Sequence, residues 1–303
     1  METRVLPFND EAVAEAARLI LAGQPVAVAT ETVYGLAADA TNAQAVARIY
    51  EAKGRPSFNP LIVHVSDLAA AERIGLFDDD AATQLAEEHW PGPLTLVVPL
   101  REGAPIASLV TAGLPTIGLR VPAHPAMQAL LAATARPLAA PSANASGAIS
   151  PTRAEHVLKS LDGRIPLIVD AGLTERGLES TIVAATGGPL RLLRRGPIEI
   201  DAMETRGTSV EAPGQLASHY APSKPLRLNA ESAADDEFLI GFGPIAGDAT
   251  LSASADLTEA ALKLFDLLHQ ADASDRRSIA VARVTDEGLG AAINDRLRRA
   301  AHR

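Results

Sequence analysis

The amino-acid sequence predicts an α/β fold, in which a larger domain with a mixed sheet and helices is followed by a smaller α/β domain. The chain has 303 residues, which is long for one ordinary domain. Its content of hydrophobic residues (47%) and charged residues (21%) lies near the globular average. Helix and strand patterns alternate over the first two thirds of the chain, and a stretch without a sustained period follows them. These observations predict two folded domains joined by a linker.

Helices of the larger domain are predicted from amphipathic runs that begin at a capping residue. Asn9 or Asp10 begins one run, which continues to Ala22, and Gly23 ends it. The other helices are predicted over residues 41–53, 80–89, 124–134 and 152–161. Short apolar runs predict strands over residues 25–30, 60–65, 94–100, 116–121, 138–142, 166–170, 181–185 and 190–194.

The remainder of the chain predicts a linker and a small second domain. Residues 204–225 carry three prolines and no sustained period, which is typical of a linker. Beyond it, strands are predicted over 226–228, 237–241 and 278–283, and helices over 256–270 and 289–301. We therefore divide the chain into residues 1–203, the linker 204–225 and a small domain at 226–303.

Composition excludes several classes of function. The net charge is −10, so the chain lacks the basic excess of a protein that grips many nucleic-acid phosphates. Cysteine is absent, which excludes disulfides and thiol catalysis and favours a reducing compartment. The seven histidines show no metal-ligand spacing, so we expect no metal site built from side chains. With no signal peptide or membrane span in the pattern, we expect a cytoplasmic protein without a membrane partner.

Lys53 and Arg55 flank Gly54 at the end of a predicted helix. Basic residues at a helix end can simply complement the helix dipole, which accounts well for Lys53. Arg55 lies between Gly54 and Pro56, where the backbone is bent and stiff. It is therefore also a candidate to bind phosphate oxygens with its planar guanidinium, as part of a clamp for a polyanion.

Residues 141–147 (PSANASG) follow a predicted strand of small residues. Their hydroxyls, amide and backbone N–H groups can surround an anion without adding charge. An ordinary Ser/Asn/Gly turn is an equally good interpretation. The spacing is not Gly-x-Ser-x-Gly, so it does not indicate a hydrolase nucleophile.

Strand alternation places His64 and Arg120 on the less apolar faces of their strands. His64 shares its face with Ile62, and Arg120 shares its face with Thr116 and Gly118. Because a buried unpaired charge is costly, Arg120 must meet water, a ligand or an acidic partner. The sequence leaves these choices open.

Two further segments lie at predicted strand ends, where α/β proteins place ligands. Residues 30–36 (TETVYGL) follow the strand at 25–30, and Arg194 and Arg195 end the strand at 190–194. They add polar and cationic side chains to the candidate ligand-binding edge.

Taken together, these segments resemble the threonylcarbamoyl-AMP synthase family, also called YrdC-like. The resemblance rests on residues 30–36 (TETVYGL), 50–65 (YEAKGRPSFNPLIVHV), 90–96 (WPGPLTL), 141–151 (PSANASGAISP), 177–183 (GLESTIV) and 193–196 (LRRG). Residues 213–222 (PGQLASHYAP) are similar to the linker of the family's long form. One departure is Ala29, where the family usually has proline. The resemblance implies a YrdC-like twisted mixed sheet for residues 1–203, as catalytic domain, and a Rossmann-like C-terminal domain.

The resemblance also implies a reaction. L-Threonine, bicarbonate and ATP would give threonylcarbamoyl-AMP and pyrophosphate, for threonylcarbamoyladenosine formation in tRNA by downstream transferase machinery. Mg²⁺ would be held mainly by the ATP phosphates. Such a transfer needs positioning and charge stabilisation, and no protein nucleophile.

By similarity, the site residues fall into two groups. The ATP-binding residues would be Lys53, Arg55, Asn59, Thr116, Ser142, Asn144, Ser150, Arg194 and Tyr220, with Lys53 and Arg55 as catalytic residues. The threonine-binding residues would be Thr32, His64, Arg120, Ala140 and Ser180. His219 and Tyr220 in the linker would close over the nucleotide as a lid.

Two other functions remain open at this stage. One is an RNA-binding module, against which the acidic charge weighs, and the other is a carbamoyl transferase with a different acceptor. Direct tRNA binding, the oligomeric state and the role of the second domain do not follow from the sequence. Neither does a general base, for which His64 is only a geometric candidate.

Overall fold

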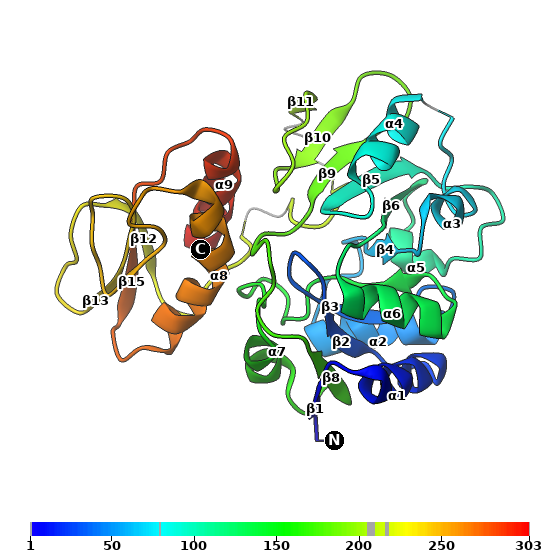
Figure 1. Ribbon diagram of the computed structural model, residues 1–303, viewed down its shortest axis with the longest axis horizontal. Coiled ribbons are helices and arrows are strands. Elements are labelled where there is room, and N and C mark those ends of the chain that lie inside the picture. The colour runs from blue at the N-terminus through cyan, green and yellow to red at the C-terminus, as the bar shows by residue number, and fades with distance from the viewer. Residues whose placement is uncertain (1, 79, 205–209, 216–217, 303) are drawn as a thin grey trace.

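The structure is a computed structural model that describes residues 2–78, 80–204, 210–215 and 218–302. It shows a larger lobe, which holds β1 to β11, and a smaller lobe, which holds β12 to β15 (Figure 1). The change from one sheet to the other falls between Glu204 and Leu226. Among the described residues, no helix combines the length and hydrophobicity that crossing a bilayer requires.

The larger lobe is built on one twisted, mixed sheet. Its strand order is β1-β8-β2-β3-β7-β4-β6-β5-β9-β10-β11. The strands are β1 (Arg4–Pro7), β2 (Val26–Ala29), β3 (Tyr34–Asp39), β4 (Ile62–His64), β5 (Leu94–Pro99), β6 (Thr116–Arg120), β7 (Leu138–Ala139), β8 (Leu167–Asp170), β9 (Thr181–Ala184), β10 (Arg191–Arg194) and β11 (Met203–Glu204). Parallel pairs such as β4–β6 alternate with antiparallel pairs such as β2–β3, which confirms the mixed sheet expected from the sequence.

Helices cover both faces of this sheet. They are α1 (Asp10–Leu21), α2 (Ala43–Lys53), α3 (Leu68–Glu72), α4 (Asp80–His89), α5 (Ser108–Thr111), α6 (Pro125–Thr134) and α7 (Ala154–Leu161). The side chain of Asn9 accepts a hydrogen bond from the N–H of Ala12 and so caps α1, as predicted. Gly54 ends α2 in the left-handed conformation (φ 59°), which turns the chain toward Arg55.

Three strands of the larger lobe, β1, β3 and β11, are not predicted from the sequence. β3 consists of YGLAAD, whose glycine and alanines carry little strand propensity. β1 has only four residues and ends at Pro7. β1 pairs with the distant strand β8, β3 pairs with its neighbour β2 and with the distant β7, and β11 pairs with β10.

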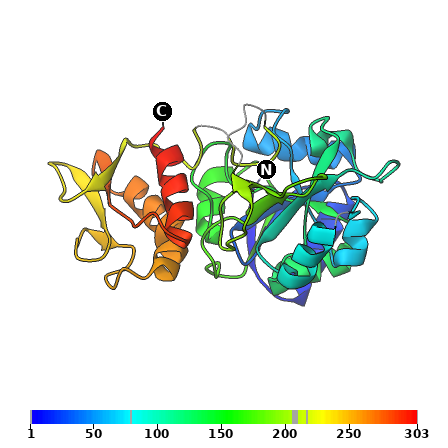
Figure 2. The same cartoon turned by 90° about the horizontal axis from the view of Figure 1, so that it is seen from above.

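The smaller lobe is a four-stranded parallel sheet with two helices. Its strand order is β12-β15-β13-β14. The strands are β12 (Leu226–Ala230), β13 (Glu237–Gly241), β14 (Ala249–Thr250) and β15 (Ser278–Ala282), and the helices are α8 (Leu257–Ala273) and α9 (Leu289–Ala301). Both views place α8 and α9 between this sheet and the larger lobe (Figures 1 and 2).

The two lobes share a hydrophobic cluster. Val33, Ile149 and Leu178 of the larger lobe belong to the same buried cluster as Phe265 of α8, and Tyr220 of the linker joins it. The backbone N–H of Ala221 also donates to the carbonyl of Gly147 over 2.8 Å. The end of the linker is thus fixed to the larger lobe and is not a free tether.

Candidate functional site

A buried pocket opens where the ends of β2, β4, β6, β9 and β10 meet the linker. The predicted residues that line it are Thr32, Arg55, His64, Arg120, Ala140, Ser142, Ser180, Arg194, His219 and Tyr220. They come from segments far apart in the sequence. The pocket therefore gathers all of the residues predicted to bind threonine and some of those predicted to bind ATP.

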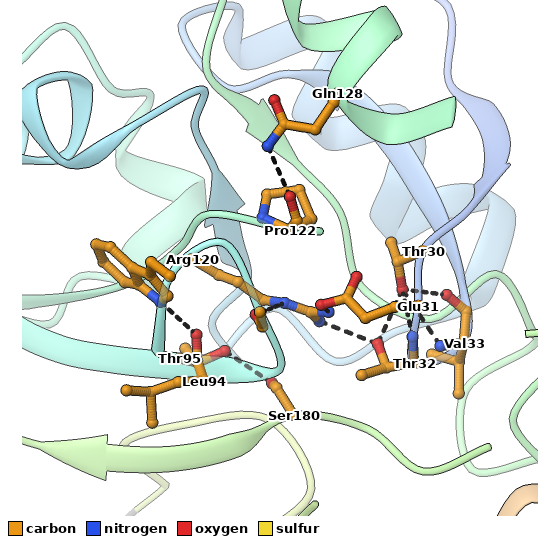
Figure 3. Close-up of polar contacts among 12 residues, drawn as sticks. Thr30, Glu31, Thr32, Val33, Leu94, Thr95, Arg120, Pro122, Gln128 and Ser180 are labelled. Carbon is orange, nitrogen blue, oxygen red and sulfur yellow. Dashed lines mark hydrogen bonds and ion pairs between the residues drawn. The ribbon is translucent and has the colours of Figure 1, made fainter. Parts of the chain in front are cut away.

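Arg120 is held in a fixed orientation at one side of the pocket (Figure 3). Its Nη2 donates to Oε1 of Glu31 over 2.6 Å, and its Nη1 donates to Oγ1 of Thr32 over 3.0 Å. Both members of the Arg120–Glu31 ion pair are buried, with side-chain exposures of 5% and 3%. Burial acts to raise the pKa of Glu31, but the charge of Arg120 outweighs it and the pKa is lowered. Each terminal nitrogen of Arg120 keeps one further N–H, which suits a bidentate carboxylate.

His64 lies beside Arg120 because β4 and β6 pair in parallel with these two residues in register. Burial, together with the charge of Arg120, lowers the pKa of His64 to about 3. In the described part of the chain, neither ring nitrogen has a hydrogen-bond partner. The pocket thus contains a neutral imidazole with one donor and one acceptor available to a ligand.

Ser180 connects this side of the pocket to Arg194. The hydroxyls of Ser180 and Thr95 lie 2.7 Å apart, and Nη2 of Arg194 donates to Oγ of Ser180 over 3.0 Å. Nε of Arg194 also donates to the carbonyl of Ser180 over 3.0 Å. These bonds fix a buried guanidinium at the start of β9.

Arg55 lines the pocket on the side of the α2 terminus. Its Nε donates to the carbonyl of Asn59 over 3.1 Å, and its Nη2 donates to the carbonyl of Pro60 over 2.8 Å. Burial lowers the pKa of Arg55 to about 10, so the guanidinium stays charged at neutral pH. Arg55 and Arg194 thereby bring two positive charges to one pocket, next to Ser142.

Lys53 is placed differently from the expectation that it contacts phosphates. Its Nζ donates to the carbonyls of Ser142 and Asn144, each over 2.5 Å, and the residue does not line the pocket. Burial lowers its pKa well below the ordinary value, and the charge of Arg55 contributes. Lys53 thus connects the 142–144 loop to the end of α2 through these hydrogen bonds.

Four other residues predicted to bind ATP lie outside the pocket lining. The amide of Asn144 donates to the carbonyls of Ala145 and Ala148, and the hydroxyl of Ser150 bonds to Glu179. The carbonyl of Asn59 accepts from Arg55, and Thr116 lines a neighbouring small cavity. Asn144 and Ser150 thus use side-chain groups within the protein, while Oδ1 of Asn59 and Oδ1 of Asn144 have no hydrogen-bond partner among the described residues.

His219 and Tyr220 extend from the linker into the same pocket. Both are buried, and their rings lie 4.1 Å apart between centroids. Tyr220 has a left-handed backbone (φ 62°), a conformation that costs energy for a residue with a side chain. Its hydroxyl has no hydrogen-bond partner among the described residues. The linker therefore forms one wall of the pocket.

The sequence reasoning missed two acidic residues at the site. Glu31 holds Arg120, and Glu179 lines the pocket directly. Both lie within the quoted motifs TETVYGL and GLESTIV, next to Thr32 and Ser180. The sequence signal that could have identified them is the acidic residue inside each of these two motifs, which are otherwise assigned to ligand binding.

Comparison with known proteins identifies the family. A family model described as "Telomere recombination" matches residues 18–196, and one described as "Threonylcarbamoyl-AMP synthase, C-terminal domain" matches residues 175–302. The chain belongs to the threonylcarbamoyl-AMP synthase family. The first model spans more than half of the chain, and the second extends through the smaller lobe.

Relatives and a solved structure match over almost the whole length. Threonylcarbamoyl-AMP synthase of Bacillus subtilis is 39% identical over 99% of this chain and 95% of its own. The synthase of Pyrococcus abyssi is 38% identical over 94% of this chain and 93% of its own. The crystal structure of P. abyssi Sua5 complexed with L-threonine superimposes with a TM-score of 0.90 at 35% identity, covering 99% of this chain and 98% of that chain.

These matches bear on the functions that the sequence left open. The relatives are synthases, so the chain is an enzyme of a family that uses ATP to form an adenylate. They support neither an RNA-binding module nor a carbamoyl transferase with another acceptor. The synthase fold confirms the predicted α/β class of both lobes.

Proposed function

We propose that this pocket joins L-threonine, bicarbonate and ATP to give threonylcarbamoyl-AMP and pyrophosphate, the activity of its family. The observation that carries the proposal is that a single pocket has a cationic side and a polar side. Arg55 and Arg194 supply cations for a polyphosphate, while Arg120 and His64 form a polar corner. The chain is then a nucleotidyltransferase in which the amino acid and the nucleotide meet between these sides.

Threonine would bind in the corner formed by Arg120, Thr32, His64 and Ser180. The free N–H groups of Arg120 would take the carboxylate in two parallel hydrogen bonds. The neutral ring of His64 and the nearby hydroxyls would bond the threonine side chain. A site that hydrogen-bonds a substrate hydroxyl rejects an analogue without it, so valine would be a poor substrate. The backbone at Ala140 would border this corner.

The nucleotide would bind along Arg55, Ser142 and Arg194, with Tyr220 covering it. Arg55 and Arg194 would offset the negative charge that shifts between phosphates during the reaction. We propose that Lys53 acts by holding the 142–144 loop in place. Asn59, Thr116, Asn144 and Ser150 would support the binding surface from behind.

The chemistry needs no nucleophile from the protein. The unprotonated amine of threonine attacks bicarbonate and yields a carbamate and water. A carbamate oxygen then attacks the α-phosphorus of ATP, and pyrophosphate leaves. Holding the reactants in position supplies much of the rate enhancement in such a reaction.

Magnesium would enter with the nucleotide. In the described ranges there is no group of three acidic or histidine side chains that could hold a metal ion. Glu179 lines the pocket, but its oxygens already bond to Ser150 and Arg296. The residues present therefore fit Mg²⁺ that is held by phosphates and water.

The linker would act as a lid over the nucleotide. The product would be released as the substrate of a second enzyme. The position of His219 and Tyr220 in the pocket lining supports this role. The product is a mixed anhydride, so a transferase that hands the threonylcarbamoyl group to tRNA must consume it. We place this work in the cytoplasm, consistent with a chain that has no cysteine. Direct tRNA binding is not part of the proposal.

The test is pyrophosphate release from ATP by the purified full-length chain. Release should require threonine and bicarbonate together, and valine should replace threonine poorly. Release that is independent of either compound would contradict the proposal.

A further inference from the structure

Arg296 is an arginine of the smaller lobe that lies inside the lobe interface. It belongs to α9 and is fully buried. Its Nε donates to Oε2 of Glu179 over 3.0 Å, and its Nη1 donates to Asp295 over 3.2 Å. Its guanidinium carbon lies 5.4 Å from the ring centroid of Tyr220. Arg296 thus contacts both an acid of the larger lobe and the aromatic residue of the linker.

Glu179 is the larger-lobe residue that carries this contact to the pocket. It lines the pocket beside Ser180, and its other oxygen accepts from the hydroxyl of Ser150. Burial acts to raise the pKa of Glu179, but the charges of Arg296 and Arg194 outweigh it and the pKa is lowered. Glu179 is therefore ionised next to the guanidinium groups that face a polyphosphate.

Burying the Arg296–Glu179 ion pair costs free energy, so we expect the pair to do more than join the lobes. Taking an arginine and a glutamate out of water costs free energy that their mutual attraction often fails to repay. The cluster shared by the lobes already holds them together without charges. Besides, Nη2 of Arg296 has no partner in the part of the chain that the structure describes.

We infer that Arg296 is a positioning residue of the nucleotide site, through which the smaller lobe neutralises Glu179 and orients Tyr220. The inference rests on the proposed function, because it assumes that a polyphosphate binds beside Glu179. Without Arg296, Glu179 would lose the larger of its two compensating charges, and its carboxylate would face the phosphates from within the pocket. The threonine corner depends on Arg120 and its partner Glu31, and would be little affected.

The experiment is ATP binding by calorimetry to the full-length chain and to three variants. Arg296→Met keeps the volume of the side chain and removes its charge, and since like charges disfavour association, we expect Kd for ATP to rise about tenfold or more. Glu179→Gln removes a negative charge beside the phosphates and leaves Arg296 charged, so it should bind ATP more tightly than the wild type. The double variant should recover most of the loss, because neither charge remains.

Arg298→Met is the matched control. Arg298 belongs to the same helix but is exposed and lies 3.8 Å from Asp286. It should bind ATP like the wild type. Threonine binding is measured on every variant, because a merely unfolded protein would lose both ligands.

Three results would overturn the inference. Arg296→Met could bind ATP as tightly as the wild type, or the double variant could be as weak as Arg296→Met, which would indicate packing alone. Glu179→Gln by itself could weaken ATP binding tenfold, which would make Glu179 a ligand contact. Because this variant is isosteric, its result can be interpreted even if Arg296→Met fails to fold. A wild-type chain that binds no ATP would instead contradict the proposed function.

Discussion

Replacing Glu31 with glutamine tests the threonine corner most sharply. The substitution keeps the shape of the side chain and removes the countercharge of Arg120, which lies 2.6 Å away in a buried pair. Removing one partner of a buried ion pair costs about 3–5 kcal/mol. We expect the free energy of unfolding to fall by that order. The variant should remain folded, because Thr32 and Gly92 still accept hydrogen bonds from Arg120.

Bound threonine should then restore part of the lost free energy of unfolding. A ligand at 100 times its Kd stabilises a protein by about 2.7 kcal/mol, and each tenfold gain in affinity at the same concentration adds about 1.4 kcal/mol. The threonine carboxylate would provide Arg120 of the glutamine variant with its missing countercharge. Threonine should therefore raise the stability of Glu31→Gln by more than it raises that of the wild type.

The assay is urea unfolding with and without threonine. Glu15→Gln is the control, because Glu15 pairs with Arg4 and Arg18 at the surface, where such pairs contribute about 1 kcal/mol or less. Its response to threonine should equal that of the wild type. An equal threonine gain in Glu31→Gln and wild type would refute the assignment of the carboxylate to Arg120.

Three further predictions concern activity, pH and packing. Arg55→Ala and Ser142→Ala should lower kcat/KM for ATP by about 100-fold or more with threonine binding intact, since each removes a group that stabilises the transferring phosphate; steady-state kinetics with wild-type values would contradict the site. His64 and His219 both have a pKa lowered to about 3 by burial, so the unfolded chain binds more protons below about pH 6.5. Stability should accordingly fall as the pH drops from 6.5 toward 3, and urea unfolding at pH 7.5 and 5 that gives equal stability would disprove this. Gly196→Ala should lower the melting temperature, because its Cβ would lie 2.3 Å from a backbone nitrogen, and thermal unfolding at the wild-type temperature would argue against a close approach there.

Much of the architecture follows from local sequence, because caps and apolar periods act locally. Asn9 caps α1 and Gly54 ends α2 as their residue types predict. The strand β3 does not follow, since its small residues become a strand only by pairing with β2 on one side and with the distant β7 on the other. Local patterns therefore predict helix ends better than they predict short strands.

The site was predictable in its residue types and not in its contacts. Alternation placed Arg120 on a polar face, but its pairing with Glu31 depends on a contact between residues 89 apart in the sequence. The Arg296–Glu179 bond joins residues 117 apart, from different lobes. Lys53, expected near a phosphate, donates to the carbonyls of Ser142 and Asn144, which lie 89 and 91 residues away in the sequence. Contacts of this kind depend on topology, which a one-dimensional pattern does not contain.

The most direct measurement is the mass of the product made from ATP, L-threonine and ¹³C-labelled bicarbonate. We predict a threonylcarbamoyl-adenylate that carries the label, with one pyrophosphate released for each molecule formed. An adenylate of threonine itself, without the labelled carbon, would contradict this prediction.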